Sequence, residues 1–145
     1  MTRQPWLIVG YLGALSANTD GFEPGSVILI EEPDIIRKRE VAAFMSRSPI
    51  LRELLEWEYH RPGAAEELYA LRPDLNPALV APLVEYATPF AARLAELYGV
   101  PGAGYAAALA MRDKALLRQI TRSAGIRKSR IERSCRPSSA RCAVS

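Results

Sequence analysis

Apolar residues in this chain gather in short continuous runs separated by turn residues. Residues 6–10 and 26–30 are two such runs; the first ends at a glycine and the second in an acidic pair followed by a proline. Short apolar runs bounded in this way are typical of buried strands in a parallel sheet. Residues 78–84 form a third run, in which Pro82 indicates a strand at a sheet edge or with a bulge.

The segment 50–59 fits two patterns. Its leucines suit a helix, whereas Leu55, Trp57 and Tyr59 alternate as the residues of a half-buried strand do. We favour a strand at the end of this segment, because the alternation leads directly into the turn residues at 61–63.

Helical spacing dominates the rest of the chain. The clearest case is 89–98, where Pro89 suits the first turn and Gly99 the end. Asp34 is a candidate cap for a turn or helix over 35–44, and Asp113 for another whose apolar residues we expect to point inward. The predicted helices are 35–44, 64–71, 89–98, 105–111 and 113–124, the last with Leu116, Leu117 and Ile120 inward.

Strands that alternate with helices predict an α/β fold, a Rossmann-like three-layer domain with a mainly parallel sheet of about four strands. We expect this domain at 1–112, a linker helix at 113–126 and a basic, poorly structured tail at 127–145, with a possible short strand at 129–133. Ligands bind beyond the carboxyl ends of the strands in such sheets. The candidate pocket residues there are Gly10, Glu31, Glu85, Gly102 and Gly104.

Charge is distributed unevenly along the chain. From Arg112 to the end there are ten Lys/Arg and two Asp/Glu, a net charge of +8, whereas the other residues sum to −5. A basic tail of this kind permits binding to nucleic acid. No aromatic residue follows Tyr105 to stack on a base, however, so we favour a solvated arm and do not favour nucleic acid as a partner. A stand-alone module that binds nucleic acid through this tail is the alternative function.

Other features exclude several classes of protein. No apolar run reaches the ~18 residues that a membrane span needs, and no signal peptide is recognisable, so we expect a cytoplasmic protein. Cys135 and Cys142 are the only cysteines, and with the distant His60 they do not make a metal site. His60 lies in a turn without triad partners, and we expect it to face solvent. Glu31 and Glu32 are adjacent on a strand and therefore point to opposite faces, which argues against a shared acid/base site.

A dinucleotide site is one alternative at the first strand. Gly10 and Gly13 follow that strand, and Glu31 lies about twenty residues further on, where an acid can bind a ribose hydroxyl. The full glycine fingerprint is absent, and no convincing helix follows to bind a pyrophosphate. Turn formation explains these glycines better, and a small NAD-binding domain remains the less favoured reading.

A second group of residues lies near the end of the chain. A helix ends in Tyr98-Gly-Val-Pro-Gly102, Asp113-Lys114 follows about ten residues later, and Gly125-Ile126 comes eleven residues after that. Each of these three motifs alone is common, since an Asp can cap a helix and a Lys can be a solvated charge. Their order and spacing along the chain are less common and are therefore more informative.

This run resembles the end of the N-terminal domain of ATP-grasp carboxylate ligases, such as biotin carboxylase, carbamoyl-phosphate synthase and amino-acid ligases. In that family a glycine-proline-glycine loop precedes an Asp-Lys pair, and a helix ending in Ala-Gly-(Ile or Val) leads to the central domain. The resemblance covers about residues 5–133, and it is most specific around 98–126. One departure is Arg127-Lys128-Ser129, where the family commonly has a proline.

The resemblance implies that Lys114 approaches the phosphates of ATP, since an ammonium on a long stem is a suitable point-charge partner for phosphate. It further implies an acyl-phosphate reaction that uses ATP, Mg²⁺ and a small carboxylate, with the Mg²⁺ ligands in two later domains. The chain stops about twenty residues after Gly125, so we expect a fragment or truncated product with no catalytic or metal-binding residue of its own and little activity alone. Its expected partner is the missing ATP-grasp domain or another chain, and a homodimer is left open.

Overall fold

Four parallel strands form the centre of the structure, a computed structural model that describes residues 4–13, 15 and 20–126. They are β1 (Trp6–Val9), β2 (Val27–Glu31), β3 (Leu51–Glu56) and β4 (Leu79–Pro82). The order in the sheet is β3-β2-β1-β4, and each neighbouring pair is parallel. The two apolar runs predicted as buried strands, β1 and β2, are therefore the two inner strands.

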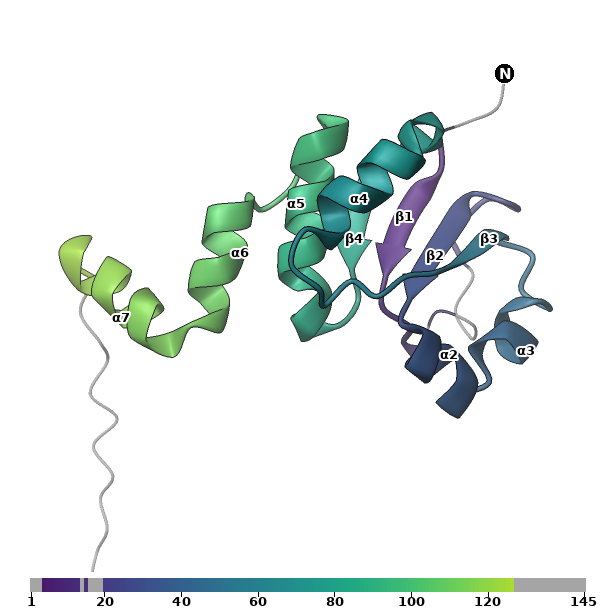
Figure 1. Ribbon diagram of the computed structural model, residues 1–145, viewed down its shortest axis with the longest axis horizontal. Coiled ribbons are helices and arrows are strands. Elements are labelled where there is room, and N and C mark those ends of the chain that lie inside the picture. The colour runs from purple at the N-terminus through teal and green to yellow at the C-terminus, as the bar shows by residue number, and fades with distance from the viewer. Residues whose placement is uncertain (1–3, 14, 16–19, 127–145) are drawn as a thin grey trace, which may run out of the picture.

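Helices cover both faces of this sheet, as Figure 1 shows. Side chains of β1 alternate between them, with Leu7 and Val9 in one buried cluster and Ile8 in the other. The first cluster packs under α4 (Ala64–Leu71) and α5 (Thr88–Tyr98), and the second under α2 (Pro33–Lys38) and α3 (Val41–Met45). The predicted three-layer α/β fold is confirmed.

The third strand differs from its expected position. It covers Leu51–Glu56, the first part of the segment 50–59, rather than the end of that segment. β3 ends at Glu56 because its neighbour β2 ends at Glu31, the residue with which Glu56 pairs. The Trp57 amide still donates to the Glu31 carbonyl at 2.9 Å, and the chain of β2 then enters α2. Trp57 and Tyr59 still pack on the same cluster as Leu55, which explains their alternation.

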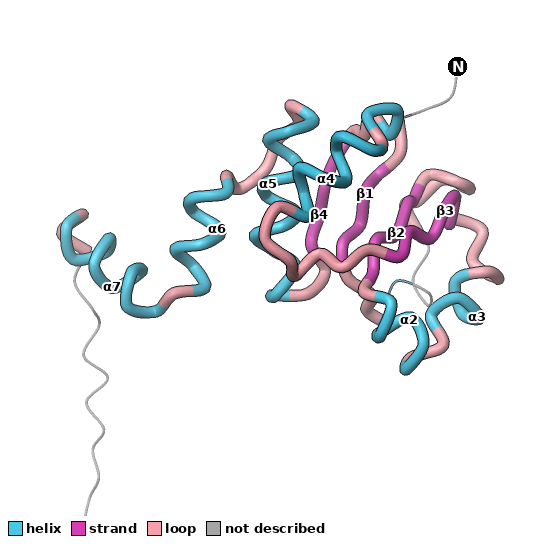
Figure 2. The backbone as a smooth tube through the Cα atoms, in the orientation of Figure 1, coloured by secondary structure: helices cyan, strands magenta, loops and turns pink. Residues whose placement is uncertain are grey.

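The helix expected over 35–44 is two helices. Pro33 is the first residue of α2, in addition to following the end of β2. The N-cap of α2 is Glu32 and not Asp34, which lies inside the helix. Glu40, at φ +49°, separates α2 from α3, and Figure 2 shows the loop between them. A left-handed residue cannot continue an α-helix, so the single element divides there.

The strand predicted over 78–84 is confirmed in a shorter form, with Pro82 at its end and β4 at an edge of the sheet. The helix predicted over 64–71 is confirmed, and α5 begins one residue earlier than expected. Gly99, at φ +68°, ends α5 in the left-handed conformation that glycine adopts readily. Residues 127–145, with the strand considered at 129–133, lie outside the described residues.

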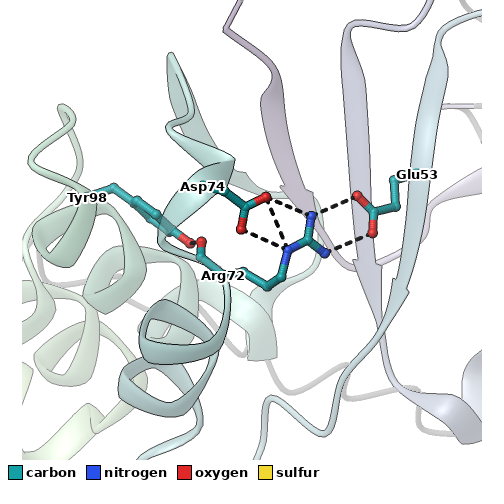
Figure 3. A network of polar contacts seen from close by, with 4 residues as sticks. All are labelled: Glu53, Arg72, Asp74 and Tyr98. Carbon is teal, nitrogen blue, oxygen red and sulfur yellow. Dashed lines mark hydrogen bonds and ion pairs between the residues drawn. The ribbon is translucent and has the colours of Figure 1, made fainter.

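Arg72, just after α4, joins one face of the sheet to the chain that enters β4 (Figure 3). Its guanidinium contacts Glu53 on β3 at 2.9 and 3.2 Å, and Asp74 in the 3-10 helix η1 (Pro73–Leu75) at 3.1 Å. The Tyr98 hydroxyl donates to the Arg72 carbonyl at 2.6 Å. This network fixes α4, α5 and β3 relative to one another.

The last two helices extend away from the sheet in Figure 1. They are α6 (Tyr105–Arg112) and α7 (Lys114–Ser123). The Asp113 side chain accepts from the amides of Ala115 and Leu116 at 2.8 and 3.1 Å, so the predicted cap is confirmed. The inward orientation predicted for the apolar residues of α7 is wrong, because this helix buries no residue and Leu116, Leu117 and Ile120 are 38 to 45% exposed.

Candidate functional site

A buried carboxylate organises the carboxyl edge of the sheet. Glu31, the last residue of β2, is fully buried, and its oxygens accept from the amides of Tyr11 and Glu32 and from the Tyr59 hydroxyl at 2.8 Å. The three donors come from the loops that follow β1, β2 and β3. Hydrogen bonds to a charged acceptor offset the cost of burying it, so Glu31 joins three loops that are distant in sequence.

Aromatic rings cover this carboxylate. The Tyr59 ring lies 6.3 Å from Tyr86 in a stacked arrangement and 5.6 Å from Phe90, and the His60 ring lies 5.1 Å from Tyr86. Burial, together with the hydrogen bond to Glu31, raises the pKa of the Tyr59 phenol far above its ordinary value. Tyr59 is therefore a permanent donor to Glu31 and not an acid that exchanges its proton near neutral pH.

Glu32 faces a surface groove of about 810 Å³ along this edge. Its Oε1 accepts from the His60 amide at 3.1 Å, and the His60 Nε2 lies 3.9 Å away. The groove runs between α2 and the loop after β3, which crosses the lower ends of the strands in Figure 2. The residues that line it are Glu32, Pro33, Asp34, Ile35, Arg37, Lys38, Glu58, His60, Arg61 and Tyr86.

A second cavity, of about 300 Å³, lies beside the groove among α4, α5 and α6. Arg93 lines it and is held by Glu66 at 2.7 Å and by Glu96 at 3.0 Å, with its guanidinium 5.9 Å from the centre of the Tyr105 ring. Arg112 donates to the Tyr86 carbonyl at 3.1 Å, which ties α6 to the groove. Aromatic and cationic side chains thus surround the carboxyl edge on this side.

The predicted pocket residues do not gather at one place in the structure. Glu31 is buried beneath the groove, and neither it nor Gly10, Glu85, Gly102 or Gly104 lines the two cavities. A Cβ on Gly10 would lie 2.3 Å from Val84 Cγ2, so that glycine permits close packing between β1 and the chain after β4. Their role as ligand contacts stays a prediction.

The other predicted residues lie toward α6 and α7. Glu85 is exposed in the 3-10 helix η2 (Glu85–Ala87). Gly102 approaches α5, since a Cβ there would lie 2.9 Å from Ala95 Cβ, and Gly104 is the N-cap of α6. Lys114 is exposed at the first position of α7, separated from both cavities, so the structure does not bring it together with the groove residues.

Tyr59 was not recognised as a site residue from the sequence, whereas Glu32 was expected with Glu31 at the carboxyl edge of the sheet. The signal for Tyr59 was present, because it follows the end of a strand, where parallel α/β folds bind ligands. Placing the third strand too late hid it, since that placement put Tyr59 inside a strand. His60 is half exposed, at 51%, as expected, although its backbone amide has the specific role described above.

Among the described residues, no group of three or more His, Cys, Asp or Glu side chains is arranged to hold a metal ion. Within the same part of the chain, no helix is both long enough and apolar enough to cross a membrane.

Comparison with known proteins yields a structural match. No family model matches the sequence. No curated protein matches it either. Among solved structures, an L-amino acid ligase from Bacillus licheniformis has a similar fold, with a TM-score of 0.61 and 17% identity. The match covers 85% of this chain and 30% of that ligase, so this chain corresponds in fold to about a third of that enzyme.

Proposed function

We propose that this chain is the N-terminal, Rossmann-like domain of an ATP-dependent carboxylate ligase, such as a carboxylate-amine ligase that forms an acyl phosphate. The observation that carries the proposal is the fold match to an L-amino acid ligase, which extends over 85% of the chain. The motif at 98–126 supports it independently, because it resembles the same family in sequence.

In this proposal the carboxyl edge of the sheet forms one wall of the active site, and α7 supplies a phosphate ligand. The Asp113 cap holds the first turn of α7, so the side chain of Lys114 leaves the helix at its exposed N-terminal end. The ammonium of Lys114 attracts phosphate, and the dipole of the helix acts in the same direction at its N-terminus. ATP and Mg²⁺ are the expected reactants of the complete enzyme, and we expect this chain to contact nucleotide only weakly.

Nucleotide binding tests the role of Lys114. Titration of a non-hydrolysable ATP analogue, followed by amide NMR, should move resonances around the start of α7 in the wild-type chain. Lys114→Ala should weaken this binding about tenfold, the loss of one charged contact to phosphate. Arg118→Ala, one turn further along the same exposed helix, is the matched control and should change it little. Equal binding by wild type and Lys114→Ala would refute the assignment.

Phosphate release tests the claim that the chain is inactive alone. We expect no release above background from ATP and Mg²⁺ in the presence of each of the common amino acids. Turnover by the purified chain that disappears in Lys114→Ala would show a self-sufficient enzyme instead, and the proposal of a dependent domain would then be wrong.

A further inference from the structure

The groove at the carboxyl edge contains one carboxylate that forms no ion pair with a Lys or Arg among the described residues. Asp34 pairs with Arg37 and, at 3.8 Å, with Lys38. Arg61 pairs with Glu58 at 3.1 Å and with Glu67 at 2.8 Å. These pairs account for every Lys and Arg that lines the groove.

Glu32 is the carboxylate that remains. Only 14% of its side chain is exposed, and although it is the N-cap of α2 its carboxylate does not cap that helix. Its Oε1 accepts from the His60 amide, but the 3.9 Å to His60 Nε2 is longer than a hydrogen bond. Within the described part of the chain, no donor is bonded to Oε2. Oε2 is not fully buried, so it is an acceptor that a donor from outside the chain can reach through the groove.

Aromatic rings stand beside this carboxylate. His60 and Tyr86 both line the groove, with ring centres 5.1 Å apart and planes inclined by 41°. A cation within ~6 Å of an aromatic ring face is attracted to it. The positive charge of Arg61, the nearest guanidinium on the same loop, is already neutralised by its two glutamates. The surroundings of Glu32 therefore favour a cation from outside the chain.

The geometry selects among cations. A guanidinium binds a carboxylate best through both oxygens, whereas Glu32 Oε1 has the His60 amide at 3.1 Å and the His60 ring nitrogen at 3.9 Å beside it, which leaves Oε2 for a single donor. A divalent metal needs several oxygen or nitrogen ligands, and no such group occurs among the described residues. An ammonium needs a single acceptor, and its alkyl stem can lie against the rings.

We propose that this groove binds a small primary alkylammonium compound, whose nitrogen donates to Glu32 Oε2 and whose alkyl chain packs on His60 and Tyr86. The site depends on the residues of the groove alone, and it stands whether or not the chain belongs to a ligase.

Butylammonium chloride is the probe, titrated at constant ionic strength and followed by amide NMR. The His60 amide, which donates to Glu32, is the direct reporter. We expect this resonance to shift in a saturable manner, and 1-butanol to leave it unchanged. Glu32→Gln keeps an acceptor for His60 and removes the charge, so it should weaken binding at least about tenfold. Glu58→Gln alters an exposed acid of the same groove and should bind normally.

Tyr86→Leu is a second variant, since it removes the ring and leaves Glu32 unchanged. It should weaken binding severalfold while the His60 reporter remains in its native position. An equal response to 1-butanol, an equal loss in Glu58→Gln, or unchanged affinity in Glu32→Gln would each overturn the proposal. So would a larger response to MgCl₂ than to butylammonium, because it would identify a metal site.

Discussion

Glu31 is an acceptor that several donors in the interior share. In Glu31→Ala the Tyr11 amide, the Glu32 amide and the Tyr59 hydroxyl all lose this acceptor. Each unsatisfied buried donor costs about 1–3 kcal/mol, and the Glu32 amide is only partly buried, so the sum is about 3–6 kcal/mol. That loss approaches the whole stability of a small domain, about 5–15 kcal/mol.

Glu31→Gln is the more informative change, because it keeps the shape of the side chain. The amide retains one oxygen as an acceptor but turns an NH₂ group toward a donor, so we expect a loss of about 2 kcal/mol. Urea unfolding of wild type, Glu31→Gln, Tyr59→Phe and the double variant would measure it. Because Glu31 and Tyr59 share a hydrogen bond, their effects should depart from additivity by about 1 kcal/mol.

Glu56→Gln is the matched control for Glu31→Gln. Glu56 pairs with Glu31 across the sheet but is exposed, so its replacement should change stability by no more than about 0.5 kcal/mol. A Glu31→Gln protein as stable as the control, or strictly additive effects with Tyr59→Phe, would refute the view that Glu31 joins the three loops.

Further predictions concern packing, pH and the arginine network. Gly10→Ala should destabilise the fold by about 3 kcal/mol in thermal unfolding, because a side chain there combines φ +89° with a clash against Val84. Gly21→Ala has the same φ but lies in open space, so it should cost only about 1 kcal/mol. Equal losses in the two variants would contradict the clash. Burial raises the pKa of Tyr98 to about 12, above the ~10 of an unfolded phenol, so its contribution is complete below about pH 10 and is lost as the pH rises toward 12. Urea unfolding between about pH 8 and pH 11 should therefore show less alkaline destabilisation in Tyr98→Phe than in wild type. Identical pH profiles of the two proteins would exclude a contribution of Tyr98 ionisation to the pH dependence of stability. Arg72→Lys loses the paired contacts to Glu53 and should lower the free energy of unfolding in urea by about 1 kcal/mol. Arg52 is exposed, so Arg52→Lys should change it almost not at all. Equal effects of the two variants would argue against a stabilising role of the Arg72 network.

Most of the fold followed from local patterns. β1 and β2 are continuous apolar runs because both of their faces are buried, and that pattern is legible without the structure. The end of α5 at Gly99 and the start of α7 at Asp113 also follow from the chemistry of single residues. These features depend on neighbours along the chain.

The errors came from features that depend on distant residues. The end of β3 is set by where β2 stops, and the division between α2 and α3 by the backbone at Glu40. The candidate site also depends on contacts between residues that are distant in the sequence. Glu31 was identified, but its role depends on Tyr59, which is 28 residues away and joins it only through the sheet. Lys114 was predicted from a motif, neither cavity includes it, and its role stays a prediction.

The position of α7 outside the core has a consequence for the dynamics of the chain. No residue of α7 is fully buried, so opening this helix exposes far less apolar surface than global unfolding does, and its opening free energy is correspondingly lower. Amide hydrogens of α7 should exchange with solvent early, those of α5 later, and those of β1 and β2 only on global unfolding. The domain therefore has a gradient of local stability that declines from the sheet to α7.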